Sequence, residues 1–237
     1  DPFGKLLASC SSDLSIKLWK FDNPLKCLKT LNGHEHLVSS VEFSPDSNIL
    51  YSASRDKTIK VWEVSSGACK STLKGHDEWV RSLSLNEKGS LLASTSDDES
   101  TIVWGLDQMV QRYTFTGHEN KIEQVLFVNL ETAKNNIYTS DYADGGTHSD
   151  QQSSEVKSEH QEKLNEITRK IADQNKLSKK IEKEYLLTCS RDKTIKLFDV
   201  YAGNCIYTFS GHDNWVRSMA IHPSGKYLIT TGDDRSI

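Results

Sequence analysis

The chain has 237 residues, of which 36% are hydrophobic and 26% are charged, and its formal net charge is −4. This length and composition are typical of a globular protein with a substantial core. The mild acidity predicts no affinity for nucleic acid or for an anionic membrane surface, since both attract basic proteins. The apolar runs are far shorter than the roughly 20 residues that cross a bilayer, so we expect no membrane span.

The first element, within residues 1–20, carries Asp13 and, six positions later, Trp19. The same spacing returns at Asp56 and Trp62, at Asp98 and Trp104, and at Asp192 and Phe198. A Gly-His dipeptide begins at residues 33, 75, 117 and 211, with intervals of 42, 42 and 94 residues. A repeat of about 42 residues with one interruption therefore organises the chain.

The stretch that follows each aspartate is predicted to be a β-strand. KTIKVWEV at 57–64 and KTIKLFDV at 193–200 alternate apolar and polar residues, and turn residues bound both. Gly-His followed after about 28 residues by Trp-Asp or a relative resembles the WD40 repeat, whose units are four-stranded propeller blades. The resemblance implies an all-β propeller whose blades pack against one another.

In a WD40 blade, a histidine, a serine or threonine, an aspartate and a tryptophan form a hydrogen-bonded tetrad, and the resemblance implies three such sets here. They are His34, Ser52, Asp56 and Trp62; His76, Ser94, Asp98 and Trp104; and His118, Thr188 and Asp192. In the third set Phe198 stands in place of tryptophan and cannot donate a hydrogen bond, so that tetrad should lack one contact.

A catalytic Ser-His-Asp site is the alternative interpretation of these residues. We reject it because the set recurs from blade to blade and the sequence has no GxSxG motif. The five cysteines are at least 16 residues apart, which excludes a CxxC zinc or redox motif. We therefore expect no enzyme activity, no metal and no cofactor, and we expect the cysteines to be reduced and buried.

The interruption adds 52 residues before the strand YLLTCS at 185–190. We divide the chain into WD40 repeats over 1–130, an insertion over 131–184 and WD40 repeats over 185–237. NIYTSD at 136–141 imitates a strand of the repeat but lacks the following aromatic residue, so it is rejected. The insertion is predicted to be disordered and then helical, and a partner-binding helix is an open alternative.

Without the insertion, about 4.4 repeats of 42 residues remain. The chain begins at the second strand of one repeat and stops before the third strand of another. We therefore expect a fragment of a longer protein that forms an incomplete arc with exposed strand edges.

The heptapeptide SRDKTIK occurs twice, at 54–60 and at 190–196, and each copy is followed one repeat later by WVRS. A propeller brings the turn before the third strand of one blade beside the entry loop of the next, on its top face. We therefore expect two clusters there: Arg55, Trp79 and Arg81, and Arg191, Trp215 and Arg217. Both are candidate partner-binding sites because Arg and Trp are enriched in interface hot spots. The alternative is that each arginine pairs with a nearby aspartate.

Longer stretches resemble the lissencephaly-1 (nuclear distribution) family of WD40 proteins, from its second blade to its sixth. They are FGKLLASCSSDLSIKLW, YSASRDKTIKVWEV, GHDEWVRSL, SRDKTIKLFDV and GHDNWVRSM. The resemblance implies a non-catalytic propeller, seven-bladed when complete, that regulates cytoplasmic dynein in microtubule-based transport and nuclear positioning. On the family's pattern Arg55, Arg81, Arg191 and Trp215 face dynein, whereas Trp79 and Arg217 come from the repeat geometry.

The same resemblance implies partners and a location. The partners are the dynein motor domain, a nuclear-distribution E-type coiled-coil protein and acetylhydrolase catalytic subunits, with homodimerisation through segments absent from this chain. The location is the cytoplasm, at microtubules and centrosomes. The alternative is a general WD40 adaptor, such as a ubiquitin-ligase substrate receptor that binds acidic or phosphorylated motifs, because a propeller fold alone does not specify a partner.

Overall fold

The computed structural model describes residues 1–128, 183–222 and 227–237. Almost all of the proposed insertion, including the rejected strand at 136–141, lies outside the described residues. Within these ranges the regular secondary structure consists of seventeen β-strands.

The strands form five antiparallel sheets, in each of which neighbours in sequence are hydrogen-bonded neighbours. The first sheet contains β1 (Leu6–Cys10), β2 (Ile16–Lys20) and β3 (Lys26–Leu31). The second contains β4 (Val38–Phe43), β5 (Ile49–Ser54), β6 (Thr58–Glu63) and β7 (Cys69–Lys74). The third contains β8 (Val80–Leu85), β9 (Leu91–Ser96), β10 (Thr101–Gly105) and β11 (Val110–Phe115). The fourth contains β12 (Ile122–Val128), β13 (Tyr185–Ser190), β14 (Thr194–Asp199) and β15 (Asn204–Ser210), and the fifth β16 (Val216–Ile221) and β17 (Leu228–Gly232).

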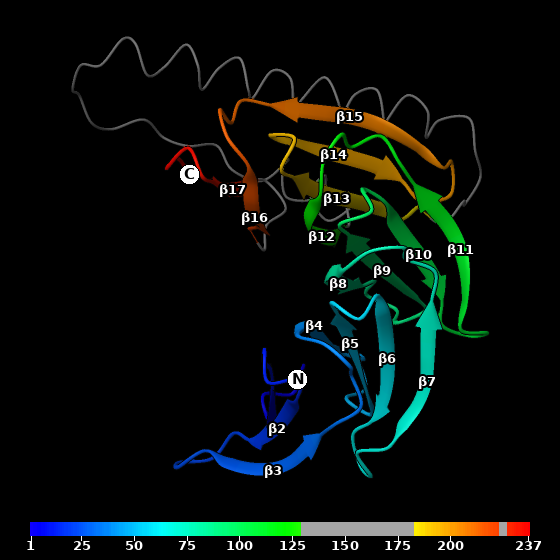
Figure 1. Ribbon diagram of the computed structural model, residues 1–237, viewed down its shortest axis with the longest axis vertical. Helices are drawn as coiled ribbons and strands as arrows, with labels where there is room; N and C mark the ends of the chain where they lie inside the picture. Colours follow the sequence, from blue (N-terminus) through cyan, green and yellow to red (C-terminus); the bar gives the residue numbers. More distant parts are fainter. Residues whose placement is uncertain (129–182, 223–226) are drawn as a thin grey trace, which may run out of the picture.

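The sheets follow one another around an open arc (Figure 1). Strands β4, β8 and β12 lie on its inner side, and β7, β11 and β15 lie on its outer side. The first and last sheets stand at the two ends, with an opening between them. The predicted all-β WD40 architecture, an incomplete propeller, is therefore confirmed.

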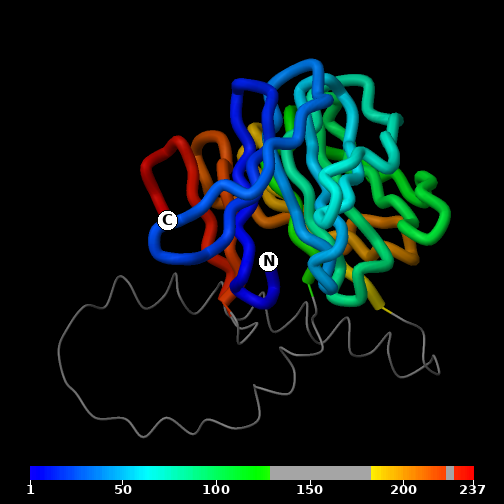
Figure 2. The backbone as a smooth tube through the Cα atoms, turned by 90° about the horizontal axis from the view of Figure 1, so that it is seen from below, coloured from blue at the N-terminus to red at the C-terminus, as the bar shows by residue number. Residues whose placement is uncertain are grey.

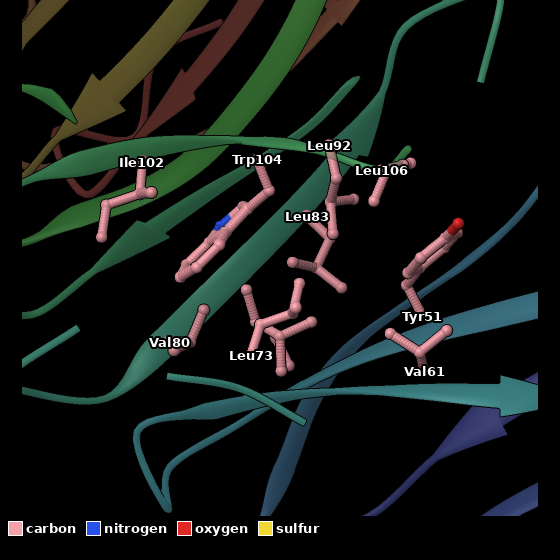
Figure 3. Packing of buried hydrophobic residues seen from close by; sticks show 11 residues of the cluster. Tyr51, Val61, Leu73, Val80, Leu83, Leu92, Ile102, Trp104 and Leu106 are labelled. Carbon is pink, nitrogen blue, oxygen red and sulfur yellow. The ribbon is translucent and has the colours of Figure 1, made fainter. Parts of the chain in front are cut away.

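Four clusters of buried apolar side chains hold the arc together, each between two successive sheets. Figure 3 shows the cluster between the second and third sheets, where Val61 and Leu73 face Val80, Leu83 and others across the boundary. The strand alternation explains this packing, because Ile59 and Val61 of KTIKVWEV lie in this cluster, whereas Trp62 and the partly buried Val64 lie in the cluster on the other side of the same sheet. Each sheet thus depends on its neighbour for its core.

Polar side chains join the innermost strands across the same boundaries. One repeat position, occupied by Ser40, Ser82 and Gln124, accepts a backbone N–H from the next innermost strand. The donors are Leu83, Val125 and Met219, at 3.3, 3.5 and 2.6 Å. These bonds satisfy backbone groups that would otherwise lack a partner at the edge of each sheet.

A tight turn that contains an aspartate follows β1, β5, β9, β13 and β17. The residue after the turn aspartate has a positive φ in every described sheet, for example 71° at Lys57 and 66° at Glu99. This left-handed conformation reverses the chain within a few residues. Figure 2 views the arc from its edge and shows the connections between strands gathered on its two faces.

Candidate partner-binding surface

The predicted tetrad residues form a continuous chain of hydrogen bonds in the second sheet. Trp62 Nε1 donates to Ser52 Oγ at 2.8 Å, and Ser52 Oγ lies 2.7 Å from His34 Nε2. His34 Nδ1 lies 2.7 Å from Asp56 Oδ2. Because an indole N–H can only donate, the serine proton is directed to Nε2 and the Nδ1 proton to the aspartate.

The third sheet repeats this chain with the predicted set His76, Ser94, Asp98 and Trp104, at 2.8 to 2.9 Å. In the fourth sheet His118 bonds to Thr188 and Asp192 at 2.8 and 2.6 Å, and Phe198 is buried without a donor. The fourth-sheet tetrad therefore lacks the indole contact, as expected. The fifth sheet contains a further set of this kind that was not among the predicted tetrads: His212 bonds to Thr230 and Asp234.

These residues have the connectivity of a catalytic triad, but their environment supports a structural role. Ser52, Ser94 and Thr188 are each 0% exposed, so a substrate has no access to the hydroxyl. Burial disfavours ionised Asp56, yet hydrogen bonds from His34 and Thr58 outweigh it and hold the pKa of that carboxyl well below its ordinary range. The aspartate therefore stays an ionised acceptor that fixes the turn.

The top face carries the loops that enter the innermost strands and the turns between second and third strands. In each of the last four sheets the turn residue before the aspartate donates its backbone N–H to the loop residue before the innermost strand, at 2.9 to 3.0 Å. The pairs are Arg55 with Leu37, Asp97 with Trp79, Arg191 with Lys121, and Asp233 with Trp215. One such backbone bond in each of these four sheets thus fixes the turn to the entry loop of the same blade.

The first predicted cluster is brought together only in part. The Arg55 guanidinium stacks over the Trp79 indole of the next sheet, and Lys121 Nζ lies 5.6 Å from the same ring. Arg55 makes no ion pair among the described residues, and its Nε is buried without a hydrogen-bond partner. Arg81 does not join this stack: it pairs with Asp97 and, at 3.2 Å, with Glu123.

The second predicted cluster is complete. Arg191 and Arg217 place their guanidinium carbons 4.4 and 4.8 Å from the centroid of Trp215. Arg217 also forms a two-bond pair with Asp233, at 2.8 and 2.7 Å. Cation–π contact and ion pairing therefore occur together. The alternative that each arginine pairs with a nearby aspartate holds for Arg81 and Arg217 but not for Arg55, and partner binding at this surface stays a prediction.

Glu123 joins the two clusters and was not predicted. Its carboxylate contacts Arg81, Arg191 and Arg217, which belong to three successive sheets. Asp97, Asp233 and Lys121 complete the same network of ion pairs. The sequence does contain a signal for this network. Two repeat positions carry opposite charges in three successive sheets, and the sign is reversed in the middle one: Arg81 pairs with Asp97, Glu123 with Arg191, and Arg217 with Asp233.

A β-bulge explains why these side chains reach the top face. In each innermost strand the register skips one residue, namely Ser39, Arg81, Glu123 or Arg217. A bulged residue leaves the ladder and its side chain is re-aimed. The network therefore depends on a backbone irregularity that alternation of apolar residues does not predict.

Other kinds of site are absent from the part of the chain that the structure describes. It shows no group of three or more metal-binding side chains, and no helix long and apolar enough to traverse a bilayer. All five cysteines are free thiols. The expectation that they are buried is wrong for Cys27, Cys69 and Cys205, because each stands near the start of an exposed outermost strand.

The fold and the repeated tetrads define a class of protein. The family model for the WD domain, G-beta repeat (WD40), matches residues 1–20, 25–63, 67–105, 179–199 and 203–237. The chain belongs to the WD40 repeat family.

Within that class, the chain is similar to fungal nuclear distribution proteins. It is 39% identical over 234 residues to nuclear distribution protein nudF 1 of Talaromyces marneffei and 44% identical over 232 residues to nudF of Aspergillus flavus. It is 38% identical over 242 residues to nuclear distribution protein PAC1 of Arthroderma otae. These matches include 98–99% of this chain but only 45–46% of each relative, so the chain spans about half their length. The resemblance to the nuclear distribution family is thereby confirmed.

Proposed function

We propose that the protein is a non-catalytic WD40 regulator of cytoplasmic dynein that binds the motor domain through its top face. The observation that carries the proposal is one connected surface of arginines and tryptophans, in a chain similar to nuclear distribution proteins. Stacked Arg–Trp pairs supply both positive charge and apolar area, and these features are typical of interface hot spots.

The motor is proposed to contribute acidic groups to this surface. Arg55 is suited to bind them because its guanidinium has no carboxylate partner among the described residues, whereas Arg81 and Arg217 each have two. Binding would then bias the conformation of the motor, since a ligand shifts an equilibrium by its differential affinity for two states.

Further parts of the proposal rest on the family resemblance. We propose a nuclear-distribution E-type coiled-coil protein and acetylhydrolase catalytic subunits as additional partners, and dimerisation through segments outside this chain. The cytoplasm, with microtubules and centrosomes, is the proposed location. A general adaptor for acidic or phosphorylated segments is the second candidate, favoured by the same unpaired Arg55.

The test is the affinity of the full-length protein for a purified dynein motor domain. Arg55→Ala together with Arg81→Ala is expected to lower it about tenfold or more, because two cationic contacts are lost. Arg112→Ala is the matched control, since Arg112 is exposed on the outermost strand β11 and its one ion-pair partner in the described part of the chain is the nearby Asp107. Unchanged affinity in a folded double variant would remove the site; binding of acidic peptides without any motor binding would favour the adaptor.

A further inference from the structure

Glu123 holds an unusual place on the top face. It is the bulged residue of β12, and the same position holds Arg81 in the preceding sheet and Arg217 in the following one. Only 10% of its side chain is exposed. A nearly buried carboxylate therefore stands between two arginines at a position where neighbouring repeats carry the opposite charge.

The contacts of Glu123 divide between its two oxygens. Oε1 accepts from Arg191 Nε and, at 3.1 Å, from Arg217 Nη1, while Oε2 accepts from Arg81 Nη1 at 3.2 Å. Charge-assisted bonds of this kind are directional and fix the side chains that donate them. One carboxylate thus orients guanidinium groups from three successive sheets.

The three arginines do not depend on Glu123 equally. Arg81 is also held by Asp97, and Arg217 by Asp233. For the guanidinium of Arg191, Glu123 is the one carboxylate partner among the described residues, and the group also stacks on Trp215. Loss of the Glu123 charge should therefore free Arg191 first.

We propose that Glu123 is a positioning residue of the partner-binding surface: it fixes Arg191 against Trp215 and joins the two clusters into one preorganised site for an acidic partner surface. This inference rests on the proposed function for its binding readout. A preorganised side chain loses less freedom on binding, so the complex dissociates more slowly. The negative charge of Glu123 has the opposite effect on association, because it weakens long-range attraction of acidic groups.

The two effects predict a kinetic signature for Glu123→Gln, which keeps the side-chain volume but removes the charge. With the full-length protein and the dynein motor domain, the association rate should rise about two- to threefold at low salt and converge with wild type at high salt. The dissociation rate should rise about tenfold at all salt concentrations. An unchanged or slower dissociation rate in a folded variant would overturn the proposal.

Asp107→Asn is the matched control, because it removes one negative charge from an exposed loop at the opposite end of β10 from the Asp98 turn, and therefore away from the top face that carries Glu123. It should leave the dissociation rate unchanged, and a tenfold rise in this control as well would assign the effect to net charge and overturn the proposal.

A second readout needs no partner. Nitrogen-15 relaxation of arginine Nε–H groups in the free protein should show Arg191 becoming mobile in Glu123→Gln, while Arg55, which does not touch Glu123, keeps its wild-type order. Equal mobility of Arg191 in both proteins would also overturn the proposal. If the wild-type protein fails to bind the motor at all, the proposed function fails, and the relaxation data still decide the role of Glu123.

Discussion

The hydroxyl of Ser94 has two partners that depend on it. It accepts the Trp104 indole N–H at 2.9 Å and lies 2.8 Å from His76 Nε2, and all three side chains are almost fully buried. Thr188 holds the same position in the fourth sheet and meets His118 but receives no indole bond, because Phe198 carries no donor. Each hydroxyl also makes a long contact with a carbonyl of the next strand, Ile102 for Ser94 and Lys196 for Thr188, at 3.4 and 3.5 Å. The two hydroxyls therefore differ by one buried hydrogen bond.

Removing each hydroxyl should expose this difference. Ser94→Ala leaves two buried polar groups unpaired, so we expect it to lower the free energy of unfolding by about 2–4 kcal/mol. Thr188→Val leaves one such group unpaired and keeps the side-chain shape, so we expect about 1–2 kcal/mol. Urea denaturation of the two variants measures both values. Equal losses would show that the indole bond contributes little.

Residue identity could be predicted from the sequence where a repeat supplied the comparison. The resemblance to the WD40 repeat implies the tetrads, and the fixed spacing then assigns each member to a numbered residue. Contacts between side chains of different blades were predicted less accurately. Trp79 was expected to meet both Arg55 and Arg81, yet Arg81 turns to Asp97 and Glu123, since an available carboxylate offers a stronger contact than the ring.

At the scale of single elements, strand β4 contains a carboxyl group in an unfavourable environment. Burial raises the pKa of Glu42 to about 7, whereas its ordinary value is near 4.5. Between about pH 4.5 and 7, Glu42 is therefore protonated in the folded protein but ionised in the unfolded chain. Stability due to this group is greatest below pH 4.5 and falls as the pH rises through 7.

Glu42→Gln should remove this dependence. Near pH 4.5 the variant and the wild type should unfold at similar temperatures, because both side chains are neutral there. At pH 8 the variant should be more stable by up to about 3 kcal/mol, a limit set by the size of the pKa shift. Calorimetry at the two pH values measures this. A difference that stays constant with pH would contradict the assigned pKa.

Strands were the elements that the sequence predicted best. The expected strand YLLTCS coincides with β13 at Tyr185–Ser190, and the alternation in KTIKVWEV matches the buried face of β6. The bulges of the innermost strands were not predicted, since alternation alone does not show where a register skips a residue. That omission explains why Glu123, a bulged residue, was missed.

At the scale of the whole molecule, the core and the top face both depend on contacts between successive sheets. Each core cluster lies between two sheets, and the top-face ion pairs join three of them through Glu123. The number and kind of blades could be predicted because the 42-residue repeat is regular. The continuity of the charged network could not, because it depends on how far each blade rotates from the next.

The central claim is that the top face binds the dynein motor domain. The most direct measurement is a cryo-electron microscopy structure of the full-length protein bound to that domain. We predict motor side chains against Arg55, Trp79 and Trp215, with a motor carboxylate within hydrogen-bond distance of Arg55. A complex in which the motor contacts the outermost strands β7 and β11 and leaves the top face exposed to solvent would contradict this claim.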